Sequence, residues 1–248
     1  MRLDLQHSVR SLALTSVVVF LFLPLAAFAL DGIDAQSAAE VQAAREQIAK
    51  EFGNAIQPGE VSAFQASSIL KNYNYLDPKH EIPNDLLEKA VVYFDANKAK
   101  FKNQNFITVV DFKPRSDQFR FFLIDLKTGE VEKFHTTHGA GSVSSGSDEG
   151  YATSFGNVID SGKSSLGFVR TAEVYTGTYH RALRLDGISS TNSNLRERAI
   201  VFHGWDGVKE QNQIQGLTLG CIALDWVIKD AVLDKIKNGS LMLVGVAN

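Results

Sequence analysis

The chain has 248 residues, of which 44% are hydrophobic and 21% are charged. This is the composition of a globular protein with one substantial core. The formal net charge is −3 at pH 7, and the pI calculated from the sequence is about 6.1. Because basic residues are not in excess, the composition does not indicate a nucleic-acid partner.

The first segment has the pattern of a secretory signal peptide. Arg2 and Arg10 precede an apolar run from 11 to 29, which contains no charged residue and ends in Ala27-Phe28-Ala29. The sequence therefore predicts a signal peptide over 1–29 and a mature protein that is periplasmic or secreted. A retained membrane anchor is the alternative, since the run approaches the length that spans a bilayer.

Helical patterns follow the apolar run. Apolar residues recur at helical spacing between 39 and 52, where Gly53-Asn54 is expected to end the helix. A second short helix is expected over 62–72, and Asn84 is expected to cap a third. Residues 30–103 are therefore predicted to form a small helical N-terminal region.

The character of the chain changes after Asn105, where segments rich in Phe, Val and Ile predict strands. These segments are 106–112, 118–126, 130–136, 166–175, 182–185, 199–203 and 240–246. Asp225 is expected to cap one embedded helix, which Gly239 ends. We therefore expect a mainly β domain over 104–248.

Cys221 is the only cysteine, so an exported chain can form no internal disulfide. A buried structural thiol is the simplest interpretation of a lone Cys. However, Cys221 follows Gly220, and His203 lies 18 positions earlier at the end of an apolar segment. A thiol needs a neighbouring base to react as a thiolate at neutral pH, and His suits this role. The pattern therefore favours Cys221 as a nucleophile and His203 as its base.

Two other motifs could mark a different kind of site. His135 and His138 could bind a metal, but on a strand they would face opposite sides, and no further ligand stands at a recognised spacing. Gly156 to Ser164 resembles a phosphate-binding loop, but five residues separate its glycines where the motif has four. We expect neither a metal site nor a nucleotide site.

At His203-Gly204 and Thr218-Leu219-Gly220-Cys221 the sequence resembles the murein L,D-transpeptidase catalytic domain family, and in particular a divergent subgroup of it. The likeness runs from about 60 to 246. It includes further motifs at 106–112, 152–155, 164–168, 183–187 and 198–201.

The resemblance implies a β-sandwich-like catalytic fold with Cys221 as nucleophile and His203 as base. The carbonyl of Gly204 would orient the His203 ring, a role that Asp or Asn fills in other triads. Thr218 and the N–H groups of Gly220 and Cys221 would line the oxyanion site and so contact the substrate.

The sequence departs from the family in two places. Many members have a second His where Leu219 stands, and many have Arg or Asn where Ala223 stands. These departures leave the substrate details open.

The implied reaction is acyl transfer on peptidoglycan stem peptides, through a thioester at the third stem residue and without a metal or organic cofactor. The alternatives are a periplasmic L,D-carboxypeptidase or amidase that hydrolyses stem peptides, and a catalytically inactive wall-binding module. Because both Cys221 and His203 are present, the sequence favours an enzyme over the inactive module.

Overall fold

The computed structural model describes residues 36–248. The expected signal peptide over 1–29 lies outside the described residues, and residues 36–248 belong to one compact unit. Within 36–248, none of the helices combines the length and the hydropathy that crossing a membrane requires.

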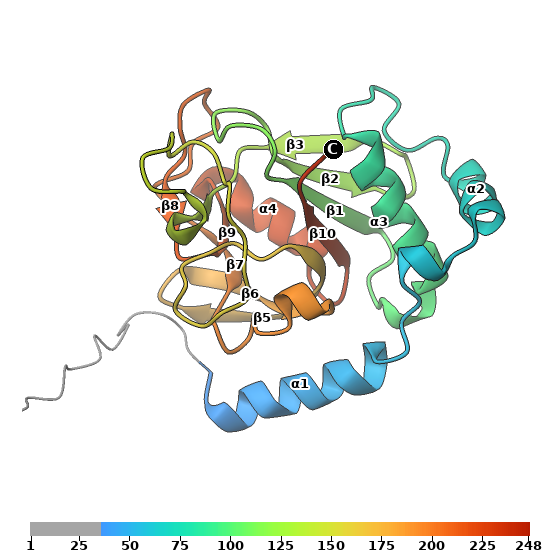
Figure 1. Ribbon diagram of the computed structural model, residues 1–248, viewed down its shortest axis with the longest axis horizontal. Coiled ribbons are helices and arrows are strands. Elements are labelled where there is room, and N and C mark those ends of the chain that lie inside the picture. Colours follow the sequence, from blue (N-terminus) through green and yellow to red (C-terminus); the bar gives the residue numbers. More distant parts are fainter. Residues whose placement is uncertain (1–35) are drawn as a thin grey trace, which may run out of the picture. The chain divides into compact units, whose positions relative to one another are not determined.

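The centre of this unit is a strongly curved, barrel-like sheet of eight strands in the order β3-β2-β1-β10-β5-β6-β7-β9 (Figure 1). The pairs β1–β10 and β7–β9 are parallel, and the other neighbouring pairs are antiparallel. The strands are β1 (Phe106–Asp111), β2 (Phe121–Asp125), β3 (Val131–Phe134), β5 (Gly167–Gly177), β6 (His180–Gly187), β7 (Val201–Gly204), β9 (Ile222–Leu224) and β10 (Leu241–Gly245). A separate parallel pair joins β4 (His138–Gly139) to β8 (Leu217–Thr218).

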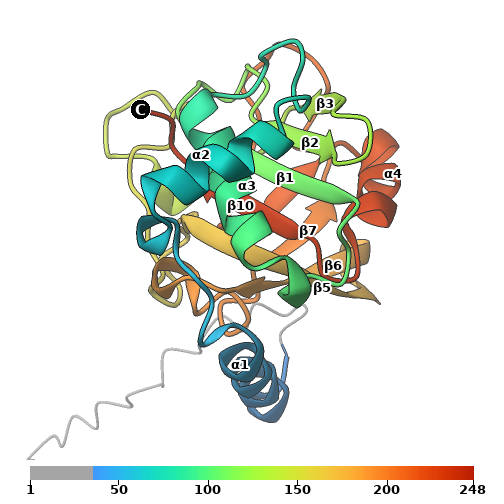
Figure 2. The same cartoon turned by 90° about the vertical axis from the view of Figure 1, so that its right-hand side faces the viewer.

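Alternating side chains give the sheet an apolar layer on each face. On β1, Ile107 and Val109 belong to a cluster with α3 (Asn84–Ala96), whereas Val110 belongs to a cluster with α4 (Trp226–Ile236). Helix α3 lies across β1 and β10 (Figure 2). Because both faces of β1 and β10 are buried, these strands form the rigid centre that supports the strands of the site.

The remaining helices lie on either side of α3 in the chain, ahead of β1, or connect strands. Helices α1 (Ala38–Phe52) and α2 (Ala63–Asn72) each begin with a capping box, formed by Ser37 with Glu40 and by Ser62 with Gln65. The short 3-10 helices are η1 (Pro58–Glu60), η2 (Lys98–Lys100), η3 (Ala140–Ser142) and η4 (Ser190–Asn192). The pattern thus identified the N-terminal helices nearly to the residue.

The structure confirms a mainly β fold with helices at its N-terminal side, and it corrects details. Asn84 is the first helical residue of α3 and not its cap, since Pro83 stands at the cap position without a side-chain hydrogen bond. Asp225 does cap α4, with its carboxylate accepting a hydrogen bond from the N–H of Val227 at 3.1 Å. Strands β4, β8 and β9 were missed because two or three residues are too few to show a period.

Candidate active site

The parallel pairing of β7 with β9 positions the two residues predicted to react. In this register Phe202 lies beside Ile222 and His203 lies beside Ala223. Cys221 therefore stands directly before β9, next to the strand that carries His203. Both side chains line the same cavity.

His203 has a buried ring that is held from two sides. Its Nδ1 lies 2.9 Å from the carbonyl oxygen of Gly204. A carbonyl only accepts, so Nδ1 carries the proton in this contact and Nε2 of the neutral ring keeps the lone pair. The ring of Tyr179 stacks on the imidazole, with centroids 3.9 Å apart and planes 25° from parallel. The ring is therefore held in the tautomer that a base requires.

Gly204 is a glycine because an aromatic ring occupies the space of a side chain. A Cβ at this position would lie 2.3 Å from the ring of Trp226, which opens α4. The ring of Trp226 thus packs directly on the backbone whose carbonyl holds His203. Any larger residue would push apart the strand and the helix at the site.

Cys221 is partly exposed, and its Sγ lies 3.8 Å from the carbonyl oxygen of Ala199. Burial of the thiol group raises the pKa of Cys221 to about 11, while the N–H of Val201 and the charge of Arg198 act to lower this pKa. Because its pKa is raised, the thiol of Cys221 is protonated at neutral pH, and its reaction depends on a base such as His203. Ala199, whose carbonyl contacts the thiol, adopts a left-handed backbone with φ of 50°.

Thr218 and Gly220 hold the turn that presents Cys221. The hydroxyl of Thr218 accepts a hydrogen bond from the N–H of Gly220 at 3.2 Å and donates one to the carbonyl of Cys221 at 2.8 Å. Gly220 has φ of +113°, and a Cβ there would lie 2.6 Å from the carbonyl oxygen of Lys163. These contacts give both residues a positioning role, and their predicted contact with the substrate stays a prediction.

The cavity beside Cys221 has a volume of about 160 Å³ and a largely apolar and aromatic lining. Its lining residues are Tyr175, Tyr179, Arg198, Ala199, Ile200, Val201, His203, Trp205, Leu217, Thr218, Leu219 and Cys221. Leu219, an apolar residue of this lining, is 51% exposed.

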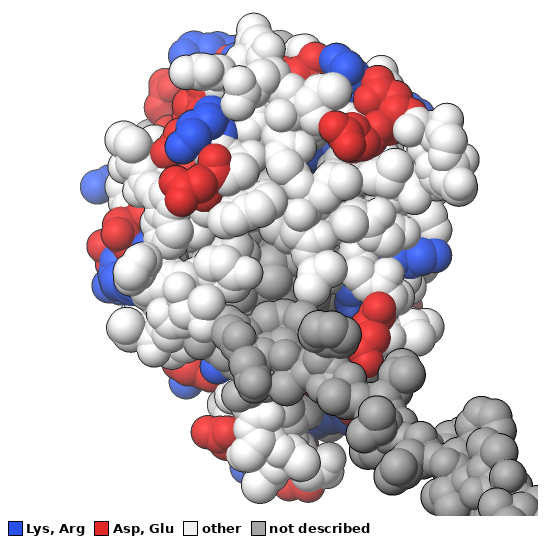
Figure 3. All heavy atoms as spheres, turned by 90° about the vertical axis from the view of Figure 1, so that its left-hand side faces the viewer, with Lys and Arg blue, Asp and Glu red and all other residues white. Residues whose placement is uncertain are grey.

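The surface on the side of β8 is poor in charge. Figure 3 shows this face, where Lys, Arg, Asp and Glu lie mainly toward the edges and the middle, outside the grey atoms, is largely uncharged. A ligand that approaches here meets polar and apolar groups more than a charged patch.

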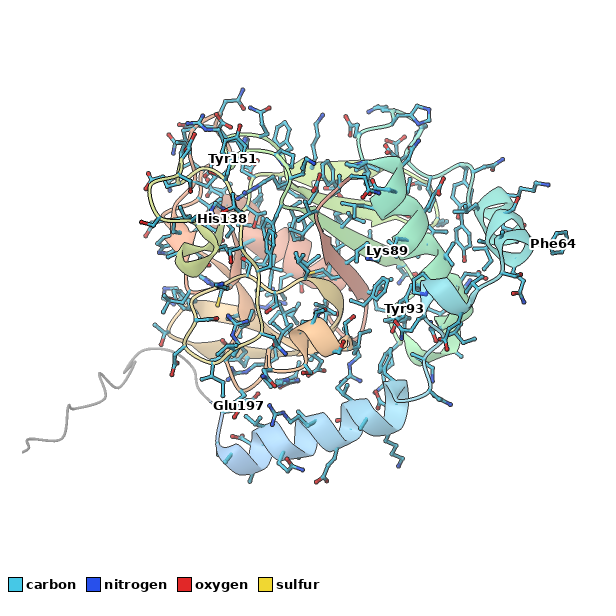
Figure 4. All side chains as sticks on the ribbon, in the orientation of Figure 1. Phe64, Lys89, Tyr93, His138, Tyr151 and Glu197 are labelled. Atoms are coloured by element: carbon cyan, nitrogen blue, oxygen red, sulfur yellow. The ribbon has the colours of Figure 1, made fainter. Side chains whose placement is uncertain are left out.

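The other two histidines weighed as ligands lie outside the cavity and serve the fold. The Nδ1 of His135 lies 3.2 Å from the carboxylate of Glu210, and its Nε2 lies 3.2 Å from the carbonyl oxygen of Asp117. His138, labelled in Figure 4, is buried with its Nδ1 3.1 Å from Arg120. Within residues 36–248, no three His, Cys, Asp or Glu side chains are grouped so that they could hold a metal ion.

The loop that resembled a phosphate-binding motif packs against the turn of Cys221. Gly162 accepts a backbone hydrogen bond from Gly141 at 3.0 Å, and the carbonyl oxygen of Lys163 lies against Gly220. Gly162 has a positive φ of +62°, a backbone conformation that favours glycine.

Sequence reasoning missed several residues of the cavity. Tyr175 and Tyr179 come from the hairpin of β5 and β6, and Trp205 follows β7. Arg198 belonged to a motif of the resemblance, but no role was assigned to it. In the sequence, only its position shortly before His203 indicated that Arg198 could lie near the site. Its contacts with Gly156 and Ser165 join segments that are far apart in the sequence.

The solved structures that are similar to this chain have low sequence identity to it. Among curated proteins, no relative matches the chain. Among solved structures, an L,D-transpeptidase from Mycobacterium smegmatis is 14% identical, with a TM-score of 0.36 over 56% of this chain and 58% of that one. This chain thus spans less than two thirds of that protein's length.

Two further structures are similar at the same level. The L,D-transpeptidase LdtMt1 in complex with imipenem is 13% identical, with a TM-score of 0.35 over 56% of this chain and 58% of that one. An L,D-transpeptidase from Stackebrandtia nassauensis is 13% identical, with a TM-score of 0.36 over 86% of this chain and 95% of that one. At TM-scores this low, we draw nothing from these structures about the site.

The family comparison is decisive because it covers more than half of the chain. The L,D-transpeptidase catalytic domain matches residues 78–244, a range that begins ahead of α3 and ends in β10 and includes both His203 and Cys221. The chain belongs to the L,D-transpeptidase catalytic domain family.

Proposed function

We propose that the chain is a cysteine acyltransferase that acts on the peptide stems of peptidoglycan. The observation that carries the proposal is the shared cavity, in which Cys221 lies beside His203 and the Nδ1 of His203 is fixed on the carbonyl of Gly204. A nucleophile, a base and a group that orients the base are the parts that nucleophilic acyl transfer requires.

In the first half of the reaction, Nε2 of His203 takes the proton of Cys221. The thiolate attacks the carbonyl carbon of the third stem residue, and a C–S bond forms. His203 then returns the proton to the departing amine of D-Ala as the C–N bond breaks, which leaves a thioester on Cys221.

The developing oxyanion needs hydrogen-bond donors at the turn of Cys221. The N–H of Gly220 already donates to Thr218, so we assign the main role to the N–H of Cys221. One donor of this kind contributes on the order of 10²–10³ in rate.

In the second half, an amine of another stem attacks the thioester. His203 accepts the proton of this amine, a new C–N bond forms, and the C–S bond breaks to release the thiolate, which is then reprotonated. Water in place of the amine gives a trimmed stem, so transpeptidation and hydrolysis differ only in the acceptor.

Incubation of the purified chain with stem tetrapeptides, followed by mass spectrometry of the products, tests the proposal. We expect a crosslinked dimer with loss of D-Ala from wild type and no product from Cys221→Ala. Tripeptide without dimer would indicate a carboxypeptidase. If folded wild type gave neither product, the interpretation as an inactive wall-binding module would replace the proposal.

A carbapenem offers an independent test of the nucleophile, since its strained lactam carbonyl is open to attack by an activated thiol. We expect intact-mass spectrometry to show one covalent adduct on wild type and none on Cys221→Ala. The same adduct on both proteins would contradict the role of Cys221.

The predicted site of action requires export. The pattern of residues 1–29 supports a cleaved signal peptide, so we expect the mature N-terminus near Leu30 in a periplasmic or secreted fraction. N-terminal sequencing decides this, because an intact Met1 in the membrane fraction would indicate a retained anchor.

A further inference from the structure

Arg198 is a charged residue that lines the cavity, and the acceptors of its hydrogen bonds are carbonyl and hydroxyl groups rather than carboxylates. Its guanidinium donates to the carbonyl of Gly156 at 3.0 Å and to the hydroxyl of Ser165 at 2.5 Å, and it also donates to the carbonyl of Lys163. Among the ion pairs of residues 36–248, none involves Arg198. Carbonyl and hydroxyl groups satisfy its donors without cancelling its charge.

This charge lies at the turn that carries the nucleophile. Arg198 lines the same cavity as Cys221, and its Nη2 lies 3.1 Å from the position that a Cβ on Gly220 would take. The thiol itself contacts the carbonyl of Ala199, the residue that follows Arg198. A partly buried cation at this place is screened less by salt than a surface charge.

We propose that Arg198 is the positioning residue that electrostatically stabilises the thiolate of Cys221. The proposal deepens the proposed function, on which it rests, by adding a counter-charge to the pair of Cys221 and His203. When His203 removes the thiol proton, the negative charge on Sγ forms beside the guanidinium. An opposite charge within a few ångströms favours the charged form of a titrating group.

The mutual influence of the two groups agrees with this geometry. Burial lowers the pKa of Arg198, while the charges of Cys221 and Asp160 act to raise it. The charge of Arg198 in turn acts to lower the pKa of Cys221, against the larger effect of burial.

The other titratable groups around the thiol are few. His203 on β7 and the two tyrosines of the β5–β6 hairpin, Tyr175 and Tyr179, line the same cavity. From the loop 156–165, Asp160 acts on Arg198, and the ammonium group of Lys163 is bound to Ser154 at 2.7 Å. Of the groups lining the cavity, Arg198 is thus the one that carries a permanent positive charge.

The rate of iodoacetamide alkylation against pH measures the thiolate directly and requires no stem peptide. At a pH below the thiol pKa, we expect Arg198→Gln to slow alkylation of Cys221 about tenfold, because one pKa unit changes the thiolate fraction tenfold. Arg198→Lys keeps the charge and retains most of the rate. Arg115→Gln is the matched control, since it removes a surface arginine paired with Asp117 and Asp148 and leaves the profile unchanged.

A merely structural role gives a different result. If Arg198 only tied the loop to the turn, Arg198→Lys would lose the forked hydrogen bonds and behave like Arg198→Gln, and this outcome overturns the proposal. An unchanged profile in folded Arg198→Gln overturns it as well. Failure of stem-peptide turnover with an arginine-dependent alkylation profile would reject the proposed function and leave this inference standing.

A second measurement applies to the wild-type chain in case the neutral variant does not fold. A cation beside the thiol attracts anionic iodoacetate more than neutral iodoacetamide. We expect the ratio of their alkylation rates to be several-fold higher on the folded chain than on the urea-unfolded chain. Equal ratios in the two states would overturn the proposal.

Discussion

At the scale of single residues, His203 differs from the other buried histidines in what surrounds its ring. It lines the cavity of Cys221, whereas His135 and His138 are bound to Glu210 and Arg120 in the interior. Of these three histidines, only His203 lines the cavity of Cys221 and has a carbonyl oxygen that fixes its tautomer.

We predict that His203→Ala lowers the rate of turnover by about 10²–10⁴, equivalent to roughly 3–5 kcal/mol of barrier. The thiol of Cys221 is protonated at neutral pH, so without the base little nucleophile forms. Leu219→Ala is the comparison, because Leu219 lines the same cavity, is 51% exposed and cannot accept a proton.

Stem-peptide turnover and alkylation rates of both variants, with circular dichroism to verify the fold, check this prediction. We expect Leu219→Ala to lose far less than His203→Ala. Equal losses in two folded variants, or near-wild-type turnover by His203→Ala, would contradict the assignment of the base.

At the scale of elements, the turn between β8 and β9 depends on a backbone conformation that favours glycine. Gly220 has φ of +113° and no space for a Cβ, which would lie 2.6 Å from the carbonyl of Lys163. Gly146 also has a positive φ, of +76°, but a Cβ there meets nothing within 4 Å. Substitutions at Gly146 and Gly220 therefore separate the free energy lost through the backbone dihedral angle from the free energy lost through steric contact of the Cβ.

We predict that Gly146→Ala destabilises the fold by about 1–2 kcal/mol through backbone strain alone. Gly220→Ala is expected to cost more and to lower turnover by about 10²-fold, since the turn must shift and carry Cys221 with it. Urea unfolding and stem-peptide kinetics on both variants test this. If Gly220→Ala kept full turnover, the turn would not need its observed conformation.

At the scale of the whole described unit, one buried ionic cluster joins the sheet to α1. Asp186 on β6 is 1% exposed at its side chain and binds both Arg170 on β5 and Arg196. Arg170 also pairs with Glu51 of α1, and Arg196 binds Gln36 ahead of that helix. Asp186 is thus shared by two arginines that hold α1 on the sheet, and Arg196 also pairs with Glu173.

We predict that Asp186→Ala lowers the free energy of unfolding by about 3 kcal/mol, because it removes the fully buried carboxylate and leaves Arg170 with Glu51 and Arg196 with Glu173, which are both more exposed. The control is Glu132→Ala, which removes a surface ion pair with Lys235 and is expected to cost at most about 1 kcal/mol. Urea denaturation of both variants measures their free energies of unfolding. Similar decreases in the two variants would show that the buried ionic cluster stabilises the fold no more than a surface ion pair does.

Stability also depends on pH through His138. Burial and the charge of Arg120 lower the pKa of His138 to about 4, so the folded state keeps this ring neutral. In the unfolded chain this ring binds a proton near pH 6.5. The contribution of the neutral His138 ring to the free energy of unfolding is therefore fully present above pH 6.5 and falls as the pH drops toward 4. The expected loss over this window is about 3 kcal/mol.

We predict that His138→Gln shows a smaller loss of unfolding free energy between pH 6.5 and 4 than wild type. The control His180→Gln changes an exposed residue at the start of β6 and should keep the wild-type loss. Urea unfolding at several pH values checks this, and parallel curves for wild type and His138→Gln would refute the role of His138.

The local features of this protein followed from its sequence. Apolar spacing predicted α1, α2 and α4, and runs of Phe, Val and Ile predicted the longer strands, because periodicity reports which face of an element is buried. The Gly-Cys turn and the His at the end of an apolar strand indicated the pair Cys221 and His203, since nucleophile chemistry limits which residues can serve.

Tertiary structure decided how these parts meet. The parallel pairing of β7 with β9 brings Cys221 beside the strand of His203, and no local pattern specifies that two strands will be neighbours in this register. The same holds for Arg198, whose partners Gly156 and Ser165 lie more than 30 positions earlier. Contacts over such separations depend on the packing of the whole sheet, and they bring His203, Arg198 and a cavity together around the lone cysteine.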